Sequence, residues 1–354
     1  MKFIYPFNAL IILLVISCSC LTSAVEHSER PTNAVYYWKT VLDIDSTDLA
    51  FIRRHDIGRI YLRMFDVVEA DYPYPADERV IPNATVRIPD PQFNLLQDSL
   101  KEIEFVPTVY VTLDALMAMW AREGELAANI VRRVSNMVRY NSLPNVAELQ
   151  LDCDWTESSE DDFFNLCDSV KKYIAADSLN WKLSATIRLH QLAHNPPPVD
   201  KGVLMVYNTG SFNNQDTHNS IIDLSDVKPY LRNLAYYPLH LDIAYPTYSW
   251  QLLFRDRKFV GLINGLPLDN DTLFSRKGNL YAVKKDFTLN NIRLLAGDVV
   301  RAEESSPQEV ITTKNMIERL FKDHPHSNII YHLDSKNLSK YSSDEINQIF
   351  YAGI

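Results

Sequence analysis

The sequence lacks the features of several large classes of protein. It has 35 Lys and Arg residues against 45 Asp and Glu, a formal net charge of -10, whereas nucleic-acid binding needs a basic surface. Gly-x-Gly-x-x-Gly, Walker, His-Glu-x-x-His and Gly-x-Ser-x-Gly patterns are absent, so nothing indicates a nucleotide cofactor, a zinc-protease site or a nucleophile elbow. We therefore expect no nucleic-acid partner, no cofactor, and a neutral or polar ligand.

One histidine pair has the spacing of metal ligands on a helix. His190 and His194 lie four residues apart, after a strand-like run and directly before Asn-Pro-Pro-Pro. Proline disfavours a helix there, so the pair is poorly placed to bind one ion. We expect no metal site.

The sequence has no hydrophobic run of membrane-spanning length at its start. The apolar stretch 9–17 has signal-peptide length, whereas a spanning helix needs about 20 residues. Val15–Ser17 before Cys18 resembles a bacterial lipobox. This resemblance implies that residues 1–20 are a signal peptide and tether, with lipid on Cys18; the alternative is a secretory signal cleaved near Ala24. We expect an exported lipoprotein, anchored to a bacterial membrane in the periplasm or at the cell surface.

Cysteine is scarce, with four residues in the whole chain. Beyond the start, Cys153 lies in a strand-like run and Cys167 in a helix-like run, and both resemble small apolar fillers. An oxidising compartment would permit a disulfide between them. We expect two free thiols and keep the disulfide as the alternative.

Strand-like and helix-like runs alternate along the chain. The strand-like runs are 34–40, 57–67, 105–112, 146–155, 181–189, 202–210, 239–248 and 328–334. The helix-like runs are 46–56, 90–103, a long one with Leu126, Ile130, Val134 and Val138 on one face, 158–175 with a Ser158–Asp161 capping pattern, 227–234, 308–324 and 342–353. This pattern predicts an α/β fold, a (β/α)₈ TIM barrel over 34–354. Short alternating runs in 251–305 predict a small antiparallel β-rich insertion between strand 7 and helix 7.

The predicted barrel has an unusually polar interior. Alternate strand residues face opposite sides, which directs these side chains inward: Gln150, Asp152, Asp154, Ser184, Thr186, Arg188, His190, His240, Asp242, and Arg63 on the face of Tyr61 and Phe65, with Asp66 at the strand end. Buried charges need partners. Asp152 is therefore expected to pair with Arg63 or Arg188, unless it serves a ligand.

The carboxylates after the fourth strand are candidate catalytic groups: Asp152, Asp154 and Glu157. Barrel enzymes place their chemistry at the carboxyl ends of the strands. Carboxyl groups at one mouth push their pKa values apart, so one could stay protonated as a general acid. Glu157 could equally be a first-turn helix charge.

Three segments resemble the family 18 glycoside hydrolases, the chitinase-like barrels. LQLDCDWTES (149–158) resembles that family's Asp-x-Asp-x-Glu signature, VLMVYNTG (203–210) its Met-x-Tyr-Asp, and DIAYPTYSW (242–250) its Pro-x-Tyr stretch. The resemblance implies an acid that protonates the glycosidic oxygen, while the substrate's acetamido group attacks. Two positions depart from it: Thr156 occupies the place of the catalytic glutamate and Asn208 that of the aspartate. Glu157 could act only if a strand-end bulge turned it inward.

Aromatic residues support a sugar-binding mouth, because rings stack on the C–H faces of sugars. Those at or near predicted strand ends are Tyr37, Trp38, Trp155, Tyr207, Tyr245, Tyr248 and Trp250. The candidate substrate-binding residues are Tyr207, Asn208, Trp38, Arg63, Asp66, Arg188, Tyr245 and Tyr248. We expect a monomeric, tethered glycoside hydrolase-like protein that acts on an oligosaccharide or polysaccharide. The alternative is a catalytically inactive lipoprotein that binds glycan or acts as a scaffold.

Overall fold

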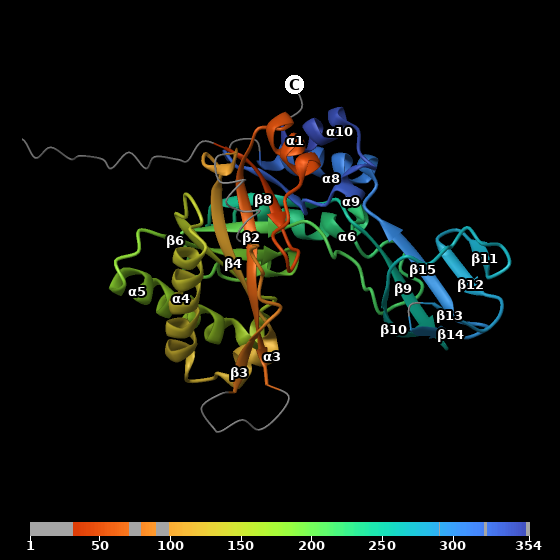
Figure 1. Cartoon of the computed structure of the whole chain (residues 1–354), viewed down its shortest axis with the longest axis horizontal. Helices are drawn as coiled ribbons and strands as arrows, with labels where there is room; N and C mark the ends of the chain where they lie inside the picture. The colour runs from red at the N-terminus through yellow and green to blue at the C-terminus, as the bar shows by residue number, and fades with distance from the viewer. Residues whose placement is uncertain (1–30, 71–78, 90–98, 290, 322–323, 352–354) are drawn as a thin grey trace, which may run out of the picture.

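The computed structural model describes residues 31–70, 79–89, 99–289, 291–321 and 324–351. The predicted signal peptide with Cys18, and most of the helix predicted over 90–103, lie outside these residues. Eight parallel strands form a closed barrel (Figure 1), in the order β1 (Asn33–Tyr37), β16 (Asn328–Tyr331), β8 (Leu241–Pro246), β7 (Lys201–Met205), β6 (Lys182–Arg188), β5 (Glu148–Asp152), β4 (Glu104–Val111) and β2 (Ile57–Glu69), which pairs with β1. The predicted (β/α)₈ barrel is confirmed.

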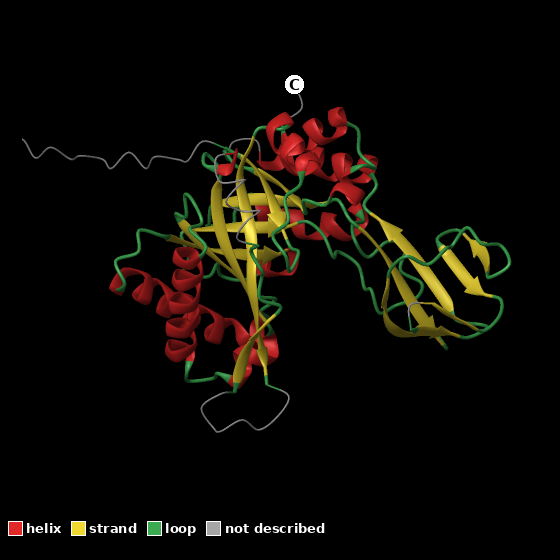
Figure 2. Cartoon of the chain, viewed as in Figure 1, coloured by secondary structure: helices red, strands yellow, loops and turns green. Residues whose placement is uncertain are grey.

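Helices cover the outside of the barrel (Figure 2). They are α1 (Ser46–Arg54), α3 (Leu113–Ala118), α4 (Glu123–Tyr140), α5 (Glu160–Ala176), α6 (Leu224–Val227), α7 (Leu231–Leu234), α8 (Pro307–Phe321), α9 (Ser335–Leu338) and α10 (Ser343–Phe350), with 3₁₀ turns η1 (Glu157–Ser159), η2 (Leu189–Ala193) and η3 (Lys228–Tyr230). Leu126, Ile130 and Val134 of α4 are buried, as helical spacing predicts. Among the described residues, no helix is long and apolar enough to cross a membrane.

The chain enters α5 differently from the prediction. β5 ends at Asp152, and the turn η1 comes before the helix. The capping box joins Thr156 to Ser159, whose hydroxyl accepts from the Thr156 backbone N–H at 3.0 Å. The predicted Ser158–Asp161 box is wrong, because the 3₁₀ turn moves the cap two residues toward the N-terminus.

Strand β2 is longer than predicted and carries an irregularity. Its end pairs with an antiparallel strand, β3 (Val80–Asn83), which the sequence analysis missed. The register with β4 shifts between Arg63 and Phe65. Phe65 therefore packs in the outer core, 5.0 Å beneath the Arg133 guanidinium of α4, and its predicted inward direction is wrong.

The antiparallel insertion is confirmed between β8 and α8 (Figure 1). One sheet has the order β10 (Lys258–Ile263), β9 (Ser249–Arg255), β15 (Val299–Glu304), β12 (Leu280–Val283) and β11 (Phe274–Lys277), and β13 (Phe287–Leu289) pairs with β14 (Ile292–Leu294). The insertion has its own apolar core, which includes Leu253, Phe274, Val283, Leu294 and Val300.

Buried charges fill the amino-terminal end of the barrel. Asp242 lies 3.5 Å from the Lys201 ammonium and 3.9 Å from the Arg59 guanidinium, and Lys201 lies 2.9 Å from Glu148. Burial alone would raise the pKa of Asp242, but His240 and Lys201 hold it well below its ordinary value. The predicted polar interior is confirmed, and its charges are paired.

The two described cysteines are Cys153 and Cys167, and both are buried free thiols. Burial raises the pKa of each thiol well above its ordinary value. The prediction of apolar fillers is confirmed, and the alternative disulfide is absent from the described residues.

Candidate functional site

Asp152 is fixed at the carboxyl end of β5 by two partners on β6. Its Oδ1 accepts from the Thr186 hydroxyl at 2.6 Å and lies 2.9 Å from the Arg188 guanidinium. Burial would lower the pKa of Arg188, but the charge of Asp152 and its neighbours raises it above its ordinary value. Of the two predicted partners, Arg188 is correct. Arg63 instead donates to Asp66 at 2.8 Å.

Asp154 lies just beyond the strand and is more than half exposed. Its carboxylate is 3.7 Å from the Arg188 guanidinium and 3.8 Å from the His190 ring. Asp154 and Asp152 therefore share the Arg188 guanidinium, and the His190 ring also lies beside Asp154. This arrangement of charged and polar groups suits the binding of a polar ligand.

Glu157 is exposed within η1. The registers of β5 with β4 and with β6 are regular up to Asp152, and Glu157 follows in the 3₁₀ turn beyond the strand. Thr156, at the position of the family's catalytic glutamate, is exposed and caps the turn.

A cluster of aromatic rings in tilted and edge-to-face contact lies at the carboxyl-end mouth of the barrel. Tyr207 lies 4.8 Å from Tyr331, Tyr248 lies 5.7 Å from Tyr331, and Trp38 lies 5.8 Å from Tyr331 between ring centroids. The Tyr248 hydroxyl donates to Asn208 Oδ1 at 2.6 Å. Burial raises the pKa of Tyr207, Tyr248 and Tyr331, so their hydroxyls stay neutral. The sequence analysis missed Tyr331, although strand alternation would have placed it inside.

Three of the predicted mouth aromatics lie elsewhere. Tyr37, Trp155 and Tyr245 are fully buried in the outer core between strands and helices. The Trp155 ring packs 5.5 Å from Phe164 of α5. The prediction that Tyr245 binds substrate is wrong, because it shares the outward face of β8 with Leu241 and Ile243.

A second polar pair stands at the mouth on β2. Arg63 and Asp66 form an ion pair three residues apart, and the Arg63 guanidinium lies 5.5 Å from the centre of the Trp38 ring. Arg63 is thereby held over an aromatic ring of the mouth. The structure thus brings Trp38, Arg63 and Asp66 together at the mouth.

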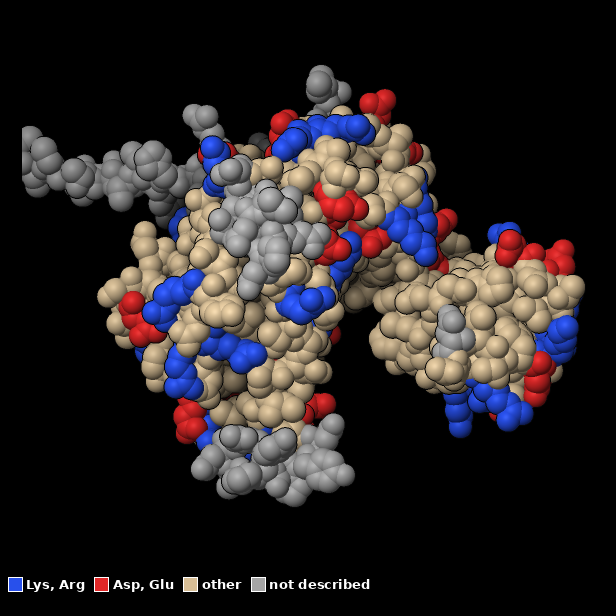
Figure 3. Space-filling view, in the orientation of Figure 1, with Lys and Arg blue, Asp and Glu red and all other residues tan. Residues whose placement is uncertain are grey.

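A cavity opens between this mouth and the insertion. It has a volume of about 1100 Å³ and is lined from the barrel by Tyr207, Asn208, Tyr248 and Tyr331, and from the insertion by Trp250, Leu262, Arg276 and Tyr281. Figure 3 shows the molecular surface hollowed between the barrel body and the insertion. We call this cavity the cleft. A cleft of this size accommodates several sugar rings.

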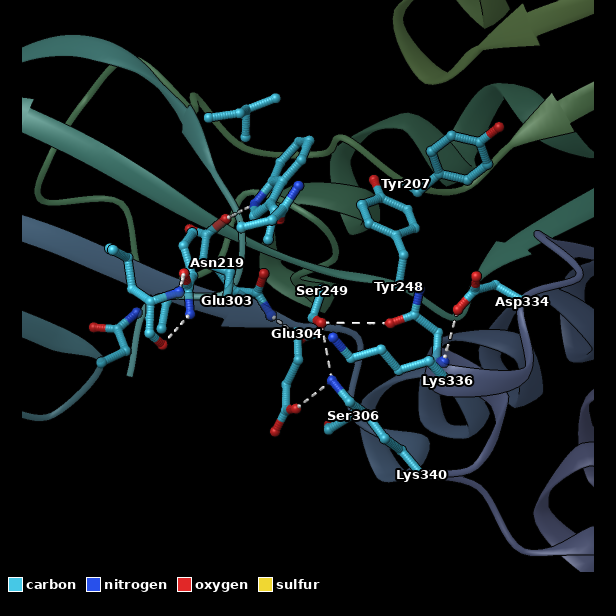
Figure 4. Close-up of a pocket in the computed structure, with 18 of the residues that line it drawn as sticks. Tyr207, Asn219, Tyr248, Ser249, Glu303, Glu304, Ser306, Asp334, Lys336 and Lys340 are labelled. Atoms are coloured by element: carbon cyan, nitrogen blue, oxygen red, sulfur yellow. Dashed lines mark hydrogen bonds and ion pairs between the residues drawn. The ribbon is translucent and has the colours of Figure 1, made fainter. Parts of the chain in front are cut away.

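A buried ion pair holds the insertion wall in place. The Arg301 guanidinium lies 2.7 Å from Glu303, and neither side chain is exposed. Glu303 accepts from the Trp250 indole N–H at 2.6 Å (Figure 4). It also accepts from the Ser220 backbone N–H at 2.9 Å. The network joins β9, β15 and the loop before α6, so it fixes the Trp250 ring at the cleft. Sequence reasoning missed both charged residues, because neither lies in a barrel strand.

The histidines singled out in the sequence have other partners. His194 lies 3.3 Å from Glu160 and His190 lies 3.8 Å from Asp154. Within the described ranges, no group of three or more His, Cys, Asp or Glu could hold a metal ion.

The fold is similar to that of solved chitinases. The similar structures include a Bacteroides thetaiotaomicron chitinase (TM-score 0.55, 9% identity, covering 90% of this chain and 96% of that one) and a Chromobacterium violaceum chitinase (TM-score 0.51, 12% identity, 88% and 98%). They also include the family 18 chitinase ChiB from the chitin utilization locus of Flavobacterium johnsoniae (TM-score 0.51, 8% identity, 91% and 94%). No protein-family model and no curated protein matches the sequence. The chain therefore has a barrel fold like that of the family 18 glycoside hydrolases.

Proposed function

We propose that the cleft binds an oligosaccharide. The observation that carries this proposal is the set of rings, Tyr207, Tyr248, Tyr331 and Trp250, which line a cleft of about 1100 Å³ together with neutral polar side chains. Aromatic faces stack on sugar rings while nearby hydroxyls and amides bind the sugar hydroxyls. The fold of chitinases, which act on polysaccharide, supports the same ligand class by analogy.

Binding without hydrolysis is the form of this function that the geometry supports best. Thr156 replaces the acid of the family pattern, Glu157 is exposed in the turn η1, and Asp152 is held by Arg188 and Thr186. A glycosidase needs a carboxyl group positioned to protonate the leaving oxygen.

Hydrolysis through Asp154 is the second candidate. Its half-exposed carboxylate stands at the carboxyl end of β5 beside Arg188 and His190, where barrel enzymes carry their chemistry. In this case Asp154→Asn would cut turnover of a glycan by at least about 100-fold and leave folding intact.

The proposed location is a membrane surface, through lipid on Cys18. The support is the lipobox-like Val15–Cys18 after a short apolar run. Several acyl chains on one cysteine would give stable anchoring.

A screen of the purified protein against labelled glycans tests the proposal. Trp250→Ala should weaken binding of a glycan found in this way by about tenfold, because it removes one stacking face. Tyr236→Ala is the matched control, since Tyr236 is an exposed aromatic that follows α7 and does not line the cleft. If the Trp250→Ala and Tyr236→Ala variants bind the glycan equally strongly, the glycan lies outside the cleft. A glycan screen that finds no binder would contradict the proposal itself.

A further inference from the structure

The barrel wall of the cleft carries two lysines around one serine hydroxyl. Lys340 lies 2.9 Å from the Ser249 hydroxyl and 3.3 Å from Glu304, which is itself well exposed. Lys336, on α9, also lines the cleft, and its side chain extends toward Ser249 (Figure 4). Ser249 and Asn337 are hydrogen-bonded at 3.5 Å beside the two lysines.

Lys336 has no carboxylate partner among the described residues. The nearest acid in sequence, Asp334, caps α9 by accepting from the Asn337 backbone N–H at 3.0 Å and lies 3.7 Å from Lys39. The ammonium of Lys336 is therefore an exposed cation directed into a cavity, with its charge uncompensated by a neighbour.

The other acids of the cleft are engaged away from these lysines. Glu303 is neutralised by Arg301 in the buried pair, and Glu309 interacts with Asn219 and the start of α6. On the opposite wall, Arg276 donates to the Gly278 carbonyl at 2.9 Å and lies 5.5 Å from the centre of the Tyr281 ring. Cations thus stand on both walls of the cleft in a chain whose net charge is -10.

From this arrangement we propose that the cleft selects an acidic oligosaccharide, one that bears carboxylate or sulfate groups, and that Lys336 and Lys340 bind an acid group. The inference rests on the proposed saccharide binding and names its ligand class. It narrows the neutral or polar ligand that the overall charge suggests to an acidic one, because local charge at the site governs recognition more than the net charge. Ammonium groups and a serine hydroxyl are donors suited to an oxyanion.

Three tetrasaccharides with one shared backbone of β-1,4-linked N-acetylglucosamine provide the test. One is neutral, one carries a lactyl carboxylate on alternate sugars, and one carries sulfate on the primary hydroxyls. We expect at least one acidic form to bind about tenfold more tightly than the neutral form at low salt. A gain in affinity of this size is what one partly exposed charge-assisted hydrogen bond contributes. About 0.5 M sodium chloride should reduce that difference.

Variants then assign the contact. Lys336→Gln and Lys340→Gln should each reduce the affinity for the acidic form by about three- to tenfold. Lys258→Gln, an exposed lysine on the edge strand β10 outside the cleft, should leave that affinity unchanged.

Equal affinities for the neutral and acidic forms would overturn the inference and leave the proposed saccharide binding in place. A preference for the acidic form that survives both lysine substitutions would overturn the assignment to Lys336 and Lys340. Failure of all three tetrasaccharides and of the wider glycan screen would instead contradict the proposed function, and the inference would fall with it.

Discussion

Replacing Asp152 with alanine should destabilise the barrel strongly. Asp152 is 5% exposed, and the change removes the anionic partner of Arg188 at 2.9 Å and the acceptor of the Thr186 hydroxyl at 2.6 Å. Breaking a buried ion pair on one side costs about 3–5 kcal/mol. The Arg188 side chain is 21% exposed and keeps Asp154 at 3.7 Å, so the lower end of that range, about 3 kcal/mol, applies here.

Urea denaturation measures this free energy of unfolding. Asp154→Ala is the matched control, because Asp154 is exposed, and it should change stability by less than about 0.5 kcal/mol. The double variant Asp152→Ala with Arg188→Met should be less destabilised than the two single costs added together, because both buried partners are then gone. Two results would refute the assignment of the Asp152–Arg188 pair as a structural element of the mouth. One is an Asp152→Ala variant as stable as the wild type, and the other is a double variant whose loss of unfolding free energy equals the sum of the two single losses.

Three more predictions concern other parts of the chain. Glu303→Gln should weaken glycan binding about as much as Trp250→Ala, because it frees the Trp250 ring. It should also lower the melting temperature, because it leaves the buried Arg301 guanidinium uncompensated. Unchanged binding in a calorimetric titration would argue against a role of Glu303 in positioning Trp250. A hydrogen bond from His326, aided by other neighbours, lowers the pKa of Glu318 to about 2. The ionised Glu318 carboxylate therefore stabilises the folded state above about pH 4.5, and this stabilisation is lost as the pH falls toward 2. Glu318→Gln should flatten the acid limb of a plot of unfolding free energy against pH, and an equally steep limb would contradict this. Cys18→Ala should abolish incorporation of labelled fatty acid and release the protein from membranes, whereas continued labelling would move the anchor to another residue.

Strand alternation predicted the interior of the barrel well. Gln150, Asp152, Thr186 and Arg188 lie inside as their spacing requires, because a strand with one face toward helices has little freedom in register. Nearness to a strand end, by contrast, does not show which face of the strand an aromatic side chain occupies. Trp155 shares the outward face of Leu149 and Leu151, and for that reason it packs under α5.

Other features could not be read from local sequence. The register shift after Arg63 arises where β2 leaves the barrel to pair with β3, and nothing in the residues around it marks the irregularity. The cleft depends on how the insertion is placed against the barrel, through Arg301 and Glu303. Such a contact joins segments about 80 residues apart, as between Ser220 and Glu303, and no periodicity of helix or strand encodes it.

A crystal structure of the protein with a bound tetrasaccharide tests the central claim most directly. The account predicts sugar rings in the cleft, stacked on Tyr248, Tyr331 or Trp250, with an acid group of the acidic form beside Lys336 and Lys340. A saccharide bound tightly at another surface, with the cleft left to solvent, would contradict it.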